Sequence, residues 1–137
     1  MIVITMKIRN IIAIYSLFIG ILMIFMWSMF ILTVQVPEMA TKPAEIMLHL
    51  LAEFTTAVLL IGGGIGLLKK IKIGYNLNLV ALGMLLYTLI VSPGYYLQRG
   101  NLAFVCVFAL LFILTLVFLI KSLKKEYEIK LDRLSPE

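Results

Sequence analysis

Hydrophobic residues occur along this chain in four long blocks, with short polar segments between them. The apolar positions in each block are nearly continuous, whereas a helix at the surface of a soluble protein confines them to one stripe. A helix needs about 20 apolar residues to cross the hydrocarbon core of a bilayer, and each block reaches or approaches this length. The pattern predicts an all-α protein, a single four-transmembrane-helix bundle in residues 1–120 with spans at about residues 11–34, 44–68, 76–92 and 102–120.

The polar segments set the expected ends of these spans. Pro43 is expected in the first turn of the second span, because a proline there removes no helical hydrogen bond. The sequence KKIKIGYN is interpreted as a turn between the second and third spans, with Gly74 as its breaker and Asn78 at the membrane boundary. Pro93 and Gly94 are expected to end the third span.

Residues 121–137 differ from the rest of the chain. Apolar side chains recur around and within them at steps of three and four residues, which gives one apolar stripe: Ile120, Leu123, Tyr127, Leu131 and Leu134. We expect a cytoplasmic amphipathic helical tail that extends the fourth span. It would lie on the anionic inner leaflet, pair with a partner helix, or remain solvated without a dedicated partner.

The composition and the placement of charge agree with a membrane protein. The chain is 63% hydrophobic with a mean hydropathy of +1.11, against roughly 45–50% apolar residues in soluble domains. Ten of the twelve Lys and Arg residues precede the first span, lie between the second and third, or follow the fourth. Such alternation is typical of cytoplasmic segments and predicts a multi-pass protein of the cell membrane with both termini cytoplasmic. The lipid bilayer is then the partner of the basic residues, and no nucleic acid is expected.

Three polar residues in the second predicted span form the main candidate site. Glu45, His49 and Glu53 follow one another at steps of four and therefore share one face of a helix. Glu45 is explained by the favourable first turn. At about 1.5 Å of rise per residue, Glu53 lies roughly 13 Å into the membrane, where an ionised side chain costs about 3 kcal/mol. We expect Glu53 to be neutral for much of the time or paired with His49.

The same depth estimate gives this pair its expected neighbours. Trp27 and Ser28 of the first span and Tyr87 of the third fall at a similar height. Two interpretations of the cluster are open: a proton or ligand site, or hydrogen bonds that hold the bundle together. No metal ligand set is predicted, and one histidine gives a bis-imidazole haem site only in a symmetric dimer.

Small residues in the same span point to helix packing rather than chemistry. Gly62, Gly63, Gly64 and Gly66 let another helix backbone approach closely. The single cysteine, Cys106, excludes a disulfide within the chain and is expected to pack as a small apolar side chain.

The stretch from Glu53 through the glycines and LLKK to ALGMLLYTLI resembles the middle two helices of the DoxX-like family of small four-helix membrane proteins. The shared features are an early acidic residue, a Gly-x-Gly-Leu close, a short basic turn and a third span rich in small residues. The resemblance implies a four-helix fold, singles out Glu53, and brings in quinone or sulfur redox chemistry, to which some members are linked.

Three functions are compatible with these patterns. The first is a small accessory or interaction protein with no catalytic activity of its own, which contacts a partner membrane protein or a second copy. The second is a small proton-coupled transporter with Glu53 as proton acceptor and Tyr87 and Trp27 along its path. The third is a membrane redox subunit in which His49 or Tyr87 binds a quinone, the one cofactor considered; otherwise none is predicted.

Overall fold

The computed structural model describes residues 2–124, with side chains from Lys7 onward. Within this part the chain is helical and has no strand. The helices are α1 (Ile2–Leu32), α2 (Glu38–Thr41), α3 (Pro43–Leu68), α4 (Lys72–Val91), α5 (Pro93–Gln98) and α6 (Leu102–Leu123). Four helical segments are long and apolar enough to cross a membrane: Lys7–Leu32, Pro43–Leu68, Lys72–Gln98 and Leu102–Leu123. The expected all-α architecture with four such helices is confirmed, while residues 125–137 of the predicted tail lie outside the described part.

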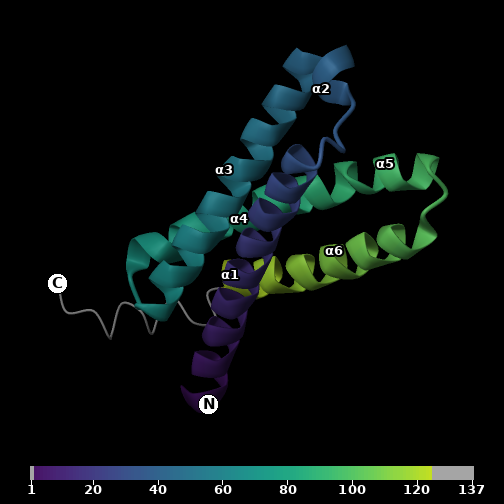
Figure 1. Cartoon of the computed structure of the whole chain (residues 1–137). Coiled ribbons are helices and arrows are strands. Elements are labelled where there is room, and N and C mark those ends of the chain that lie inside the picture. Colours follow the sequence, from purple (N-terminus) through teal and green to yellow (C-terminus); the bar gives the residue numbers. More distant parts are fainter. Residues whose placement is uncertain (1, 125–137) are drawn as a thin grey trace.

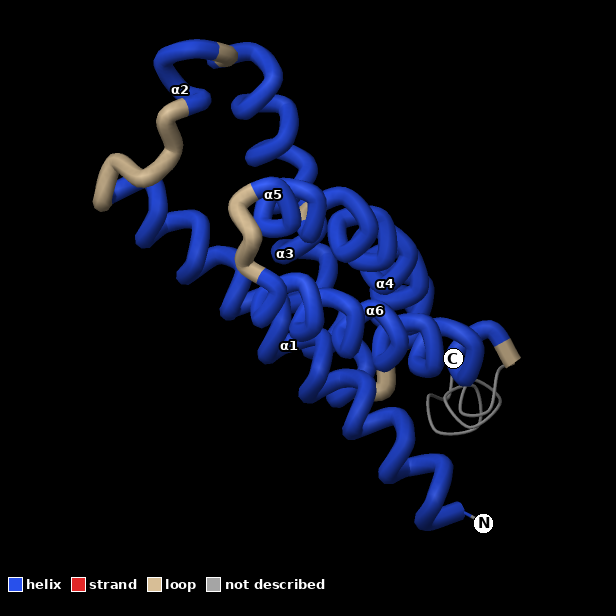
Figure 2. The backbone as a smooth tube through the Cα atoms, turned by 90° about the vertical axis from the view of Figure 1, so that its right-hand side faces the viewer, coloured by secondary structure: helices blue, strands red, loops and turns tan. Residues whose placement is uncertain are grey.

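Helices that follow one another along the chain are neighbours in space. The most extensive helix–helix contacts are those of α3 with α1 and of α3 with α4. The helix α6 packs on α4. In Figure 1, α1 and α3 run side by side, while α4 and α6 extend away from them toward α5. Figure 2, turned by a quarter, shows α6 in front of the other long helices with α1 running past it. In the order α1, α3, α4, α6, the helices α3 and α4 each have two long neighbours, and α6 lies at one side.

The helices differ in how much of their surface is buried within the chain. Half of the most apolar window of α3 is buried, compared with 6% of that of α6. The core consists of apolar side chains from α1, α3 and α4, among them Ile12, Ala57, Leu60, Leu82 and Leu85. The helix α6 contacts this core through a narrow strip with Phe108, Leu111, Phe112, Phe118 and Leu119.

Glycines set how closely the helices of the core approach one another. A Cβ added to Gly66 of α3 would collide with Cα of Gly74 on α4, and the reverse addition would collide with Gly66. Gly74 therefore lies inside α4 as a contact residue, and the prediction that it breaks the helix is wrong. The turn is made instead by Lys69–Ile71, where Lys70 has a φ of 58° and the Ile71 N–H donates to the Gly66 carbonyl.

The expected end of the third span is only a local break. The helix α4 ends at Val91, but Ser92 keeps helical dihedral angles and α5 begins at once with Pro93 in its first turn. Proline removes one backbone donor without preventing a new helix from starting, so the chain stays helical as far as Gln98.

Candidate functional site

Glu53 is a buried carboxyl at the contact between α3 and α1. It lies on α3 with 5% of its surface exposed. Its Oε2 accepts a hydrogen bond of 3.3 Å from Nε1 of Trp27 on α1. This hydrogen bond joins α1 to α3, and it agrees with the expectation that Trp27 lies at the height of the candidate site.

The second oxygen of Glu53 has no such partner. Nε2 of His49 lies 3.9 Å from Oε1, which is beyond hydrogen-bond distance, and Oε1 is buried without a hydrogen bond in the described part of the chain. The His49 ring packs edge to face against Trp27, with ring centroids 5.5 Å apart. The three side chains thus form one cluster, the Trp27–His49–Glu53 cluster.

The cluster has one side open. The His49 side chain is 34% exposed, compared with 6% for that of Glu53. A water molecule or a small polar ligand bound beside the two atoms would bridge Nε2 and Oε1, because 3.9 Å is too long for a direct hydrogen bond. Among the described residues no group of three His, Cys, Asp or Glu side chains is placed to hold a metal ion.

A family model described as "Domain of unknown function (DUF8058)" matches residues 6–135. The chain belongs to the DUF8058 family. The match includes all four long helices and the Trp27–His49–Glu53 cluster. No curated protein and no solved structure matches the chain. The resemblance to the DoxX-like family stays a prediction.

Two other residues expected in the site of this DUF8058 chain lie outside the cluster. Tyr87 is 65% exposed and points to the side of α4 opposite its buried residues. A depth estimate gives height along a helix but not rotation about it, which explains the difference. Ser28 is half-buried and has no hydrogen bond to another described residue. Glu45 is exposed and forms a 3.5 Å ion pair with Lys42, one turn earlier.

The glycines of α3 divide into two groups. A Cβ added to Gly63 would lie 2.7 Å from the backbone nitrogen of Asn78, and one added to Gly64 would lie 2.9 Å from the Ala13 carbonyl oxygen. Together with Gly66, these glycines allow α4 and α1 to approach α3 closely. Gly62 is exposed, and a Cβ there would meet nothing within 4 Å. The expected packing role therefore does not extend to Gly62 within one chain. Cys106, expected to be packed, is exposed on α6.

Two further polar contacts join helices of the DUF8058 chain, and the sequence did not single them out. Asn78 is fully buried rather than at a boundary, and its Nδ2 donates to Ser16 Oγ of α1 at 2.7 Å. The hydroxyls of Tyr15 and Thr115 lie 2.6 Å apart and link α1 to α6. Isolated polar residues in the middle of apolar blocks were the available signal, because such residues need a partner in an apolar setting.

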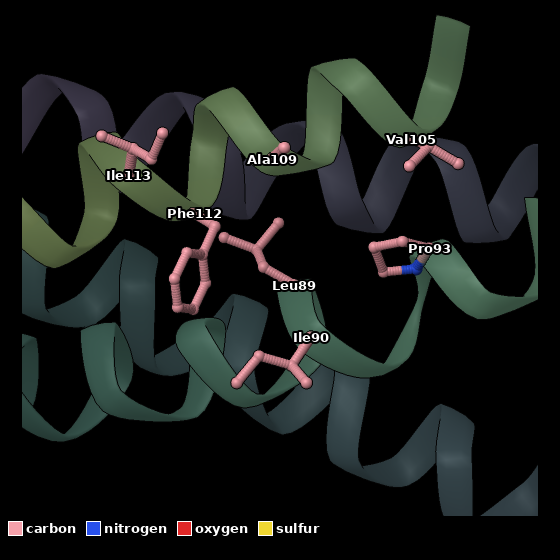
Figure 3. Close-up of a pocket in the computed structure, with 7 residues that line it drawn as sticks. All are labelled: Leu89, Ile90, Pro93, Val105, Ala109, Phe112 and Ile113. Carbon is pink, nitrogen blue, oxygen red and sulfur yellow. The ribbon is translucent and has the colours of Figure 1, made fainter. Parts of the chain in front are cut away.

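A shallow apolar groove lies elsewhere. Figure 3 shows it between α4 and α6, with apolar side chains on both walls: Leu89, Ile90, Pro93, Val105, Ala109, Phe112 and Ile113. It contains no residue of the Trp27–His49–Glu53 cluster. The polar cluster and the apolar groove are therefore separate features of the molecule.

Proposed function

We propose that this chain is a small multi-pass integral membrane protein with an accessory or interaction role and no catalytic activity of its own. The observation that carries this proposal is the surface of α6. Its residues are strongly apolar, yet only Thr115 and Ser122 are buried within the chain. The exposed apolar surface of such a helix must be covered in a bilayer, either by lipid or by the helices of another membrane protein.

The buried polar side chains support the same function. The pairs Trp27–Glu53, Ser16–Asn78 and Tyr15–Thr115 each join two different helices. In an apolar setting such bonds stabilise one arrangement of helices over others. The described polar residues are thus accounted for largely by holding the helices together, as an interaction scaffold requires.

Charge supports an orientation for this protein. The ends of the helices where α3 meets α4 carry the basic residues Lys7, Arg9, Lys69, Lys70, Lys72, Lys121 and Lys124, called the basic end here. The opposite end has Lys42 and Arg99 together with Glu38 and Glu45. By the positive-inside rule the basic end faces the cytoplasm, which places both termini there.

Cys106 provides a direct test of the interaction role. It is the single cysteine of the chain and is exposed on α6. Treating native membranes with a short thiol-reactive photocrosslinker should attach the α6 face to a partner membrane protein or to a second copy. A discrete adduct of defined mass is the expected result, identified by mass spectrometry.

A matched control moves the thiol to another exposed apolar position. The double variant Cys106→Ala with Ile14→Cys presents a thiol on α1, where Ile14 is 60% exposed. An adduct at Cys106 but not at position 14 supports a specific face. Crosslinks only to lipid, or equal adducts at both positions, would overturn the interaction role of α6.

One observation favours a second candidate, a small proton-coupled carrier. A buried carboxyl oxygen without a hydrogen bond, 3.9 Å from an imidazole that reaches the surface, is an incompletely satisfied group of the kind that binds and releases protons. In this function His49 passes protons between the surface and Glu53, and Trp27 holds the other carboxyl oxygen.

Reconstituted vesicles test the carrier. Purified chain in proteoliposomes loaded with a pH-sensitive dye would dissipate an imposed pH gradient faster than empty vesicles, and Glu53→Gln would abolish the difference. Glu45→Gln is the matched control, because Glu45 lies two turns before Glu53 on the same helix but is exposed and pairs with Lys42. Equal rates for wild type, Glu53→Gln and empty vesicles would remove the carrier and leave the accessory role. The quinone alternative, in which His49 or Tyr87 binds the quinone, stays a prediction.

A further inference from the structure

Arg9 is a buried cation near the start of α1 for which the described helices supply no counter-ion. Only 3% of its surface is exposed. Nη2 donates a 3.2 Å hydrogen bond to the Asn10 side chain, and Nε is buried without a partner. A guanidinium keeps its charge under all physiological conditions and presents five donors, so most of its hydrogen-bonding capacity is unused.

The described residues of the basic end supply no negative charge to Arg9. The other charged residues of the described basic end are all lysines, from α1, the α3–α4 turn, α4 and α6. The three described acidic residues, Glu38, Glu45 and Glu53, lie in α2 or the first half of α3, away from this end. A buried charge is tolerated when it is paired and hydrogen-bonded, so the arrangement calls for an anion from outside the described helices.

Position along the helices identifies the class of anion. The next turns of α1 are already apolar core, since Ile12 and Ala13 are fully buried and Ala13 contacts Gly64. Arg9 therefore lies where the apolar part of the bundle ends. In the proposed membrane setting this is the level of lipid headgroups, and the lysines of the same end attract anionic ones.

Partly exposed polar residues lie next to Arg9 on α1. Asn10, the partner of the Arg9 guanidinium, is half-buried, and Lys7 one turn earlier is exposed. Nη2 of Arg9 is thus bonded to a residue that reaches the surface, while Nε is enclosed. A guanidinium is a planar fork of donors that matches a phosphate, which arginine binds through two parallel hydrogen bonds.

We propose that Arg9 is the anchor of a binding site for the phosphate headgroup of an anionic phospholipid in the leaflet at the basic end. Arg9 holds the phosphate through two hydrogen bonds, Asn10 orients the guanidinium, and the exposed Lys7 and Lys69 contribute long-range attraction. The site rests on the membrane setting of the proposed function but not on the accessory role of α6.

The test uses the purified full chain in a mild non-ionic detergent. Phosphatidylglycerol, or phosphatidylcholine with the same acyl chains, is added at increasing mole fraction, and bound lipid is measured by native mass spectrometry together with the melting temperature. Wild type should bind phosphatidylglycerol in a discrete stoichiometry and melt at a higher temperature with it, and respond far less to phosphatidylcholine. Arg9→Gln should weaken phosphatidylglycerol binding about tenfold, the loss expected for a hydrogen-bonded charge pair.

Lys7→Gln is the matched control, since it removes the same charge from an exposed position two residues away. It should change the affinity by about twofold, as for a screened surface charge. Equal losses in Lys7→Gln and Arg9→Gln would overturn the site in favour of diffuse attraction. Equal binding of the two lipids by wild type would overturn it as well.

Two further measurements distinguish a lipid phosphate from other anions that could pair with Arg9. Inorganic phosphate alone should not raise the melting temperature; a rise equal to that with phosphatidylglycerol would overturn the lipid assignment. If the chain's own carboxylates beyond residue 124 balance Arg9, then Arg9→Gln lowers stability in lipid-free detergent and leaves phosphatidylglycerol binding unchanged, which also overturns it. Should Arg9→Gln fail to fold, Arg9→Lys keeps the charge but loses the fork, and wild-type affinity in that variant would contradict the proposal.

Discussion

The Ser16–Asn78 pair shows how much a single hydroxyl can matter in an apolar bundle. Both residues are fully buried, and Asn78 Oδ1 already lacks a hydrogen bond among the described residues. The 2.7 Å bond to Ser16 is the one described hydrogen bond of the Asn78 side chain. Without it the whole amide is buried unpaired.

Ser16→Ala should therefore destabilise the protein by about 0.5–2 kcal/mol, the range for interhelical hydrogen bonds. The measurement is the free energy of unfolding in detergent, followed by circular dichroism. Ser28→Ala is the matched control on the same helix, because Ser28 has no hydrogen bond to another described residue, and it should leave stability unchanged. Equal losses in the two variants would show that the Ser16 hydroxyl has no special role.

A second prediction at the residue scale concerns Trp27. Trp27→Phe keeps an aromatic ring but removes the N–H that binds Glu53 Oε2, so both carboxyl oxygens become unpaired. Stability should fall by about 0.5–2 kcal/mol. The same change in a Glu53→Leu background should cost less, because the hydrogen bond is already absent there. An identical cost in both backgrounds would mean that only the ring of Trp27 contributes.

At the scale of elements, the contact between α3 and α4 depends on glycine in each helix. Gly66→Ala places a methyl group against the backbone at Gly74, and neither atom belongs to a flexible side chain. The helices must separate, with an expected loss of about 1–3 kcal/mol for overpacking. Gly62→Ala is the control four residues earlier on α3: with nothing within 4 Å of its Cβ, it should be neutral or gain about 0.5–1 kcal/mol from helix propensity. Thermal unfolding of both variants measures this, and a stable Gly66→Ala would contradict the close contact.

The elements themselves were largely predictable, and the contacts between them only in part. Four apolar blocks specify helices because a backbone in lipid must satisfy its own hydrogen bonds. The start of α6 at Leu102 matches the expected one, since Gly100 with a φ of 70° and Asn101 interrupt the helix just before it. Gly74 was misjudged because a glycine that breaks a helix and one that packs against a neighbour look alike in sequence.

Rotation about the helix axis accounts for the remaining differences. Depth arithmetic gave Trp27 and Tyr87 similar heights, but only Trp27 faces α3. The buried residues of α4 include Asn78, Leu82, Leu85 and Leu89, and Tyr87 is out of phase with them. Asn78 is in phase with Leu82, Leu85 and Leu89 on the α4 helix. A comparison of these helical positions in the sequence would have predicted Asn78 in the core and Tyr87 at the surface. Burial of Arg9 had no such signal, because a basic residue before an apolar block is ordinarily exposed.

At the scale of the whole molecule, the proposed topology places the start of α3 outside the cell and its end inside. Two single-cysteine variants are made in a Cys106→Ala background. Met39→Cys places the thiol in α2, where Met39 is 42% exposed, and Lys69→Cys places it in the α3–α4 turn, where Lys69 is exposed. A membrane-impermeant maleimide added to intact cells should label Met39→Cys, and should label Lys69→Cys only after permeabilisation, because in the proposed topology α3 crosses the bilayer once and the basic end is inside.

The pattern of labelling distinguishes the ways in which this arrangement can fail. Reversed labelling would invert the protein and transfer the Arg9 site to the opposite leaflet, while the contacts among helices would stand. Labelling of both positions from outside would mean that α3 does not cross the bilayer. Glu53 would then not lie within the hydrocarbon core, and its burial would no longer carry the cost that makes the Trp27–His49–Glu53 cluster a candidate proton site.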